Sequence, residues 1–146
     1  MLIDREALCG LIPHAGRMCL LSGVLDWSED SILCTAISHR ESDNPLRAEG
    51  RLASVHLLEY GAQAMAVHGR LLADDPSGIP VAGYLAALQD VELHQEFLDD
   101  VIEPLEIRAH KLAASDQCLM YRFTVAAAER VLVSARATIV LRGMTQ

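Results

Sequence analysis

Hydrophobic and polar residues alternate along much of the second half of the chain, which is the pattern of strands that bury one face. Between residues 133 and 142, for example, apolar side chains occupy nearly every second position. The run 81–93 is longer and more apolar, as expected of a strand at the centre of a sheet. A polar turn at 28–30 separates two further candidates. The predicted strands are 18–27, 31–38, 81–93, 105–110, 119–125 and 133–142.

One long segment, 52–73, has a helical composition instead, rich in Ala, Leu, Met and Gln and free of proline. It is apolar on nearly all sides, which indicates a buried helix. A shorter helix is predicted at 4–11, with Asp4 as its N-cap. The order of elements is a short helix, two strands, a long helix and four strands. This order predicts an α+β fold, in one domain spanning 1–146, in which an antiparallel sheet curls around the long helix.

Four polar side chains lie within the long helix, namely His56, Glu59, Tyr60 and Gln63. Their spacing places them on one narrow stripe. Burial of a carboxylate is costly unless it is paired, and desolvation would favour its protonated form, which suits a general acid. Free N–H groups at the helix start could polarise a carbonyl oxygen. The alternative is structural: Glu59 pairs with an arginine and His56 packs in the core.

Composition narrows the functional classes. The net charge of −8 argues against partners such as nucleic acid or an anionic membrane surface. The N-terminus shows no signal-peptide pattern and no apolar run is long enough to span a bilayer, so we expect a cytoplasmic protein. No metal-ligand spacing or phosphate loop is present, so no metal and no cofactor is expected. The four cysteines, which lack CxxC spacing, are expected to be reduced: Cys9, Cys19, Cys34 and Cys118.

Two segments resemble the bacterial β-hydroxyacyl-[acyl-carrier-protein] dehydratases. Residues 11–21 read Leu-Ile-Pro-His-Ala-Gly-Arg-Met-Cys-Leu-Leu and resemble the opening loop and strand of that family. Residues 57–66 read Leu-Leu-Glu-Tyr-Gly-Ala-Gln-Ala-Met-Ala and resemble the family's helix signature, a Glu followed one turn later by Ala-Gln. The most similar subgroup is the dehydratase-like proteins of aryl polyene biosynthesis. The resemblance implies the hotdog fold.

The resemblance also implies an activity: dehydration of a 3-hydroxyacyl thioester to the trans-2-enoyl thioester in fatty acid or polyene-type biosynthesis. The acyl chain would be carried on the phosphopantetheine of an acyl-carrier protein, and the enzyme would be a homodimer or a heterodimer with another hotdog subunit. Glu59 matches the acid that protonates the leaving hydroxyl. The substrate would lie at the helix start, against Leu52 and Ala53, with Tyr60 and Gln63 beside it.

The chain departs from this family at the catalytic base. The family's Gly-His-Phe-Pro-Gly loop falls on residues 44–48, and Pro45 stands where the histidine is expected. His56, His14 and a histidine from a partner chain are the alternatives. Two other functions therefore stay open. The chain could be a non-catalytic hotdog subunit that supports an active dehydratase, or an acyl-thioesterase whose carboxylate activates water.

Three arginines flank the predicted helix start, namely Arg40, Arg47 and Arg51. Because carrier proteins are acidic, a basic rim there would steer their docking. The alternative is that these are ordinary loop arginines, since acidic residues are interleaved with them. The remaining histidines are expected at the surface or in packing: His39, His68, His94 and His110.

Overall fold

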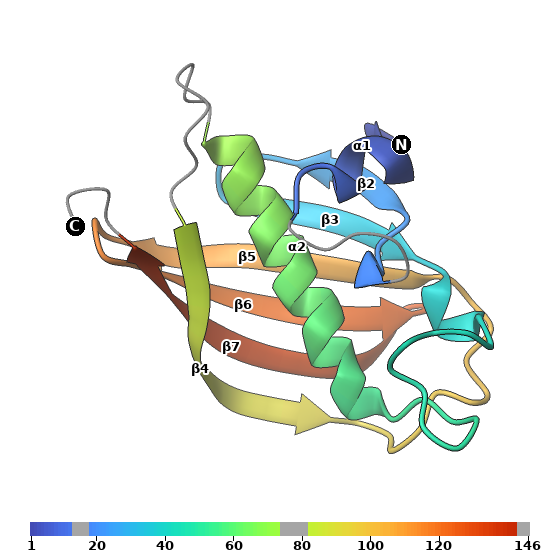
Figure 1. Cartoon of the computed structure of the whole chain (residues 1–146). Helices are drawn as coiled ribbons and strands as arrows, with labels where there is room; N and C mark the ends of the chain where they lie inside the picture. The colour runs from blue at the N-terminus through green and yellow to red at the C-terminus, as the bar shows by residue number, and fades with distance from the viewer. Residues whose placement is uncertain (13–17, 74–81, 143–146) are drawn as a thin grey trace.

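The computed structural model describes residues 1–12, 18–73 and 82–142. Within this part of the chain, an antiparallel sheet of seven strands is ordered β1-β2-β3-β5-β6-β7-β4 (Figure 1). The alternating strands of the second half are confirmed, and β5 buries every second side chain over its first half. The strands are β1 (Ile3–Asp4), β2 (Gly23–Trp27), β3 (Ser31–Ala36), β4 (Ala82–Leu93), β5 (Leu105–Ala114), β6 (Cys118–Ala127) and β7 (Arg130–Arg142).

The long helix α2 (Leu57–Leu72) lies diagonally across one face of the sheet, which curls around it (Figure 1). This confirms the α+β arrangement. The sheet and helix α2 approach each other closely at Gly61, where an added Cβ would lie 2.3 Å from the Phe123 ring on β6. A residue without a side chain is therefore required at that contact. None of the described helices combines the length and hydropathy needed to cross a membrane.

The helix begins later than predicted. A 3₁₀ turn, η3 (Ser54–His56), precedes α2, and the residues before it are extended. The backbone of 52–54 pairs with 96–98: Leu98 N–H donates to the Leu52 carbonyl and Ser54 N–H to the Glu96 carbonyl, at 2.9 and 2.8 Å. These backbone groups are thus used in strand-like pairing, so the helix starts after them.

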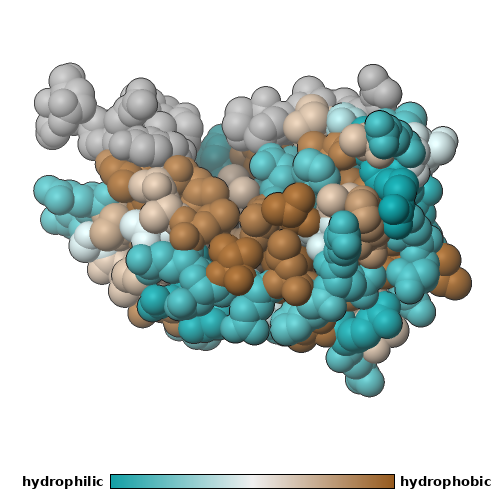
Figure 2. Space-filling model, turned by 90° about the horizontal axis from the view of Figure 1, so that it is seen from below, coloured by the Kyte–Doolittle hydropathy of each residue, from teal (hydrophilic) through white to brown (hydrophobic). Residues whose placement is uncertain are grey.

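Strand β4 was predicted at the centre of the sheet, and that prediction is wrong. It lies at the edge and pairs only with β7 in the described part of the chain. Its apolar side chains are consequently exposed: Leu85, Val91 and Leu93 are 41%, 40% and 46% accessible. Figure 2 shows an apolar area bordered by polar residues on the face seen from below. An apolar edge strand left open is a template for pairing with another chain.

The N-terminal helix α1 (Arg5–Cys9) confirms the predicted cap, because Asp4 accepts a hydrogen bond from Ala7 N–H at 3.0 Å. The expectation that all four cysteines are free is wrong for one pair. Cys9 and Cys19 form a disulfide, with their Cα atoms 5.8 Å apart. Helix α1 carries Cys9 to Cys19, whose carbonyl accepts a hydrogen bond from the Arg5 guanidinium at 2.8 Å. Cys34 and Cys118 are free thiols.

Candidate functional site

A hollow of about 400 Å³ lies at the start of the long helix. One wall is η3 and the residue before it, and the other is the chain that leaves β4. Ser54 joins the walls, because its N–H donates to the Glu96 carbonyl at 2.8 Å and its hydroxyl donates to the Gln95 carbonyl. The lining residues are Ala53, Ser54, Val55, Leu93, His94, Gln95 and Glu96. The lining is mixed, with apolar side chains from both walls and a histidine from one.

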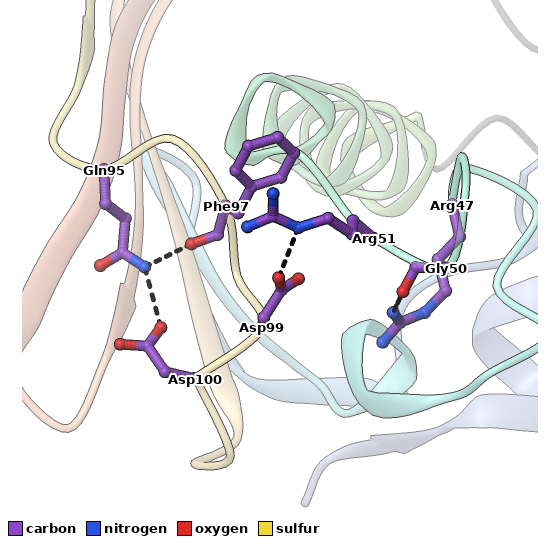
Figure 3. Close-up of polar contacts among 7 residues, drawn as sticks. All are labelled: Arg47, Gly50, Arg51, Gln95, Phe97, Asp99 and Asp100. Atoms are coloured by element: carbon purple, nitrogen blue, oxygen red, sulfur yellow. Dashed lines mark hydrogen bonds and ion pairs between the residues drawn. The ribbon is translucent and has the colours of Figure 1, made fainter.

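The loop behind this hollow is held in place by Arg51 (Figure 3). The Arg51 guanidinium lies 3.6 Å from the centroid of the Phe97 ring, and its Nε donates to Asp99 at 2.7 Å. Gln95 closes the same loop by donating to the Phe97 carbonyl at 2.7 Å. A stacked, ion-paired arginine restrains the loop more than an exposed ion pair alone does. The wall formed by the chain that leaves β4 is therefore well anchored.

The predicted acid Glu59 lies one turn after Val55, in the first turn of α2. Its side chain is partly exposed, so the expectation of a buried carboxylate is wrong. His56 occupies the N-cap position of α2, is also partly exposed, and is not among the described residues that line the hollow. Ala53 lines the hollow, whereas Leu52 is only 1% exposed and belongs to the core.

Gln63 points the other way, into the protein, where it is 2% exposed. Its side-chain carbonyl accepts from Leu20 N–H at 2.9 Å, and its amide donates to the Met18 carbonyl at 2.6 Å. Both ends of the amide are thus used by backbone. In the structure the Gln63 amide therefore bridges α2 and the segment 18–20, and the contact with substrate that the resemblance implies stays a prediction.

Tyr60 is also fully buried and hydrogen-bonded. Its hydroxyl lies 2.8 Å from Ser38 Oγ and accepts from Asn44 Nδ2 at 3.1 Å. Ser38 Oγ donates to the Leu20 carbonyl at 2.7 Å, so the tyrosine hydroxyl donates to Ser38. Burial raises the pKa of Tyr60 despite these hydrogen bonds. The network ties the loop that carries Pro45, where the family histidine is missing, to the helix.

The three arginines predicted to receive a carrier protein all make contacts within the chain. Arg47 donates to the backbone carbonyls of Glu41, His39 and Gly50, each at 2.8 Å, so it clamps its own loop. Arg40 donates to a single carbonyl, that of residue 102, at 2.9 Å. Arg40 and Arg51 are exposed and Arg47 is not. A docking role therefore remains a proposal better suited to Arg40 and Arg51.

Two histidines are packing residues. His68 is fully buried, and its Nε2 lies 2.8 Å from the Ser28 carbonyl, which can only accept, so Nε2 carries the proton. Its Nδ1 then accepts from the Tyr121 hydroxyl at 2.6 Å. His39, in η2 (Ser38–Arg40), is 1% exposed, and neither ring nitrogen has a hydrogen-bond partner within the described residues. Burial lowers the pKa of both imidazoles.

His94 is the residue of this site that sequence reasoning missed. It was expected at the surface or in packing, and its side chain is indeed 48% exposed, but it lines the hollow beside η3. Nearly forty residues separate it from Val55, so no local pattern connects the two. The other candidate base, His14, lies outside the described residues. Within residues 1–12, 18–73 and 82–142, no three His, Cys, Asp or Glu side chains are grouped as metal ligands.

Comparison with solved structures identifies the fold. The dehydratase heterocomplex ApeI:P from Xenorhabdus doucetiae superposes with a TM-score of 0.80 at 20% identity, covering 94% of this chain and 92% of that chain. A thioesterase from Haemophilus influenzae gives a TM-score of 0.70 at 13% identity, covering 100% and 98%. A mutant thioesterase from Pseudomonas aeruginosa gives 0.66 at 12% identity, covering 97% and 95%. At such low identities these likenesses establish the hotdog fold, as expected from the resemblance.

The family of the chain is established by comparison of its sequence with family models. No curated protein matches the chain significantly. The family model described as ApeP dehydratase, however, matches residues 7–143. That range includes the helix with Glu59, both walls of the hollow and the open edge strand. Because the match extends over nearly the whole chain, the protein belongs to the ApeP-like dehydratase family.

Proposed function

We propose that the chain is a subunit of a hydro-lyase that converts a 3-hydroxyacyl thioester into the trans-2-enoyl thioester. The observation that carries this proposal is the position of Glu59 in a member of a dehydratase family. The carboxylate stands in the first turn of α2, one turn beyond Val55, which lines the hollow. A substrate in the hollow would thus meet a proton donor at its edge.

The reaction needs an acid and a base. The base removes a proton from the carbon next to the thioester carbonyl, the carbon–carbon double bond forms, and the bond from the next carbon to its hydroxyl breaks. Glu59 supplies the proton with which that hydroxyl leaves as water. His56 and His14 are the candidate bases given by the sequence. No electrons are gained or lost, so the chemistry requires no cofactor.

The proposed substrate is attached to the phosphopantetheine of an acyl-carrier protein, in fatty acid or polyene-type biosynthesis in the cytoplasm. Carrier proteins are acidic, and this chain also carries a net negative charge, −8. Because like charges repel, docking would depend on a local cluster of positive charge. Arg40 and Arg51 are exposed near the helix start and would supply it. Charge reversal at Arg40 is expected to raise KM for the carrier-bound substrate while leaving a pantetheine thioester unaffected. Charge reversal at Arg51 would in addition break its contacts with Phe97 and Asp99 and so loosen a wall of the hollow.

A second hotdog subunit is the proposed partner, seated on the edge of β4. The exposed apolar side chains of that edge and the adjacent Val55 favour a protein neighbour over water. The similar solved structure from X. doucetiae is itself described as a dehydratase heterocomplex, ApeI:P. We extend such pairing to this chain, as a homodimer or as a heterodimer.

The test is turnover of a 3-hydroxyacyl pantetheine thioester by the chain alone and together with its hotdog partner. Glu59→Gln is expected to lower the rate by about 10²–10⁴-fold, the usual contribution of a general acid. The matched control is Glu106→Gln, which changes an exposed carboxylate on β5 and should leave the rate unchanged. Full activity of Glu59→Gln would disprove the assignment of the acid. Release of free thiol instead of the enoyl product would select the thioesterase alternative.

The second candidate function is that of a non-catalytic subunit. It is favoured by Pro45, which stands where the related dehydratases carry their histidine. In that case turnover would require the partner, and Glu59→Gln in this chain would leave turnover by the pair unchanged. The same assay therefore separates the two candidates.

A further inference from the structure

We infer that His94 is the catalytic base of this site, an assignment that rests on the proposed dehydration. Dehydration needs a proton acceptor beside the carbon next to the thioester carbonyl. Among the described residues that line the hollow, His94 is the histidine. It comes from the wall opposite η3, so a substrate held in the hollow would lie between His94 and the helix that carries Glu59.

The backbone of His94 is fixed beside the hollow, and one carboxylate lies near its ring. Its backbone N–H donates to the Leu132 carbonyl at 2.9 Å, which fixes the end of β4 against β7. On the ring, Nε2 lies 3.8 Å from a carboxylate oxygen of Glu92. A carboxylate on this side favours the tautomer that carries its proton on Nε2, which leaves the Nδ1 lone pair free to accept a proton. Glu92 is therefore a positioning residue.

The surroundings of His94 favour proton abstraction from carbon. Val55 and Leu93 supply apolar walls to the hollow, and both are about half exposed without a partner, at 45% and 46%. A substrate or a neighbouring subunit covering them would exclude water, which strengthens the interaction between the base and the thioester. The side chain of His94 is itself 48% exposed, so a substrate can reach it directly.

The balance of the step is simple. Nδ1 of His94 takes the proton from the carbon next to the thioester, and the electron pair of that bond becomes the new double bond. The bond between the neighbouring carbon and its hydroxyl breaks, and Glu59 gives that oxygen a proton, so water leaves. His94 ends protonated and Glu59 ionised. Exchange of one proton with solvent at each residue restores the starting state.

His56 is the main competitor, because it lies one turn before Glu59. Its side chain is not among those that line the hollow, whereas Val55, directly before it, is. In a 3₁₀ turn, neighbouring residues point about 120° apart, so the turn that presents Val55 to the hollow directs His56 away from it. The geometry therefore favours the histidine of the opposite wall.

A labelling experiment tests this placement without depending on turnover. Diethyl pyrocarbonate acylates accessible neutral imidazoles, and the extent of modification at each histidine is read by peptide mass spectrometry. A 3-hydroxyacyl pantetheine thioester at saturating concentration should protect His94. It should leave His110 labelled, because that exposed histidine lies on β5 away from the hollow. Equal labelling of His94 with and without the thioester would overturn the inference.

Variants supply the second readout. His94→Asn is expected to lower kcat by about 10²–10⁴-fold, whereas His110→Asn on β5 should retain activity. Glu92→Gln should lower kcat less than His94→Asn does and leave KM unchanged, as expected of a residue that orients the base without touching the substrate. An unchanged melting temperature shows that His94→Asn is folded.

The outcomes separate this inference from the proposed function. If the unmodified protein dehydrates the thioester and His94→Asn does so equally well, the base lies elsewhere and the proposed function survives. If the unmodified protein, alone and with its hotdog partner, produces no enoyl thioester, the proposed function fails and the assignment of His94 fails with it.

Discussion

Replacement of Gln63 by leucine separates a structural role for this residue from a role in substrate binding. The resemblance to the dehydratases implies that the glutamine one turn after Glu59 lines the substrate site. In the structure its amide instead bridges two backbone groups of the segment 18–20. Leucine keeps the size and the apolar contacts of the side chain but removes both hydrogen bonds. The expected result is a loss of stability.

The magnitude follows from what is left unpaired. Leu20 N–H would lose its acceptor in a buried position, and the partly buried Met18 carbonyl would lose its donor. An unsatisfied buried polar group costs about 1–3 kcal/mol, and less where water can reach it. Together the two groups should lower the free energy of unfolding by about 2–4 kcal/mol. For a domain of this size that corresponds to a fall of roughly 5–10 °C in Tm.

Thermal unfolding followed by circular dichroism, together with urea titration, measures this effect. Gln117→Leu is the matched control, because Gln117 is an exposed glutamine in the turn before β6. Exposed substitutions of this kind usually change stability by less than about 0.5 kcal/mol. Gln63→Glu isolates one of the two bonds, since a carboxylate can accept from Leu20 N–H but cannot donate to the Met18 carbonyl. It should therefore destabilise at neutral pH and recover in part on acidification.

A Gln63→Leu protein with the same Tm as the unmodified protein would refute this reasoning. If that variant also showed a higher KM for the thioester, Gln63 would be a substrate contact, as the resemblance implies. A large fall in Tm with an unchanged KM below the melting transition would instead confirm the bridge.

Three further predictions concern stability. Gly61→Ala should cost about 1–3 kcal/mol by forcing a Cβ against the Phe123 ring, whereas Gly69→Ala on the same helix, with open space around it, should stabilise by up to about 1 kcal/mol; urea unfolding of both measures the contrast. Cys9→Ser opens the disulfide, whose sequence separation of 10 predicts a loss of about 3 kcal/mol; reductant should lower the unmodified protein to the same stability and leave the variant unchanged. Burial lowers the pKa of His39 in the folded protein, so on acidification the unfolded chain binds a proton there before the folded protein does. The free energy of unfolding should therefore fall as the pH drops below about 6.5. His39→Leu should flatten that fall between pH 7.5 and 5.5, and the same slope in the variant and the unmodified protein would contradict the prediction.

The order of elements could be predicted from the sequence because periodicity reports which side of an element is buried. The alternation in 105–110 and the apolar composition of 52–73 both reflect contacts with one core. The strand is confirmed, and the helix is confirmed except that it begins at Leu57. The position of β4 could not be predicted in this way. A strand that will be covered by another chain has the same apolar pattern as one covered by its own sheet. Periodicity therefore identifies β4 as a strand that needs covering but does not identify what covers it.

Only the part of the candidate site that lies on the long helix could be predicted from the sequence. The position of Glu59 near the start of the helix could be predicted, because it depends only on the sequence of that helix. Helical spacing also groups Gln63 with Glu59 on one polar stripe. In the structure, however, Gln63 is buried in the core whereas Glu59 is partly exposed. His94 reaches the hollow through the path of β4 and the loop after it, which is a long-range property of the sheet. The edge strand that the sequence patterns misplaced is thus also the element that delivers His94, so the error about the sheet and the missed residue have one cause. Any partner seated on the open edge of β4 would also border the hollow, which makes the pairing of subunits and the completion of the site a single event.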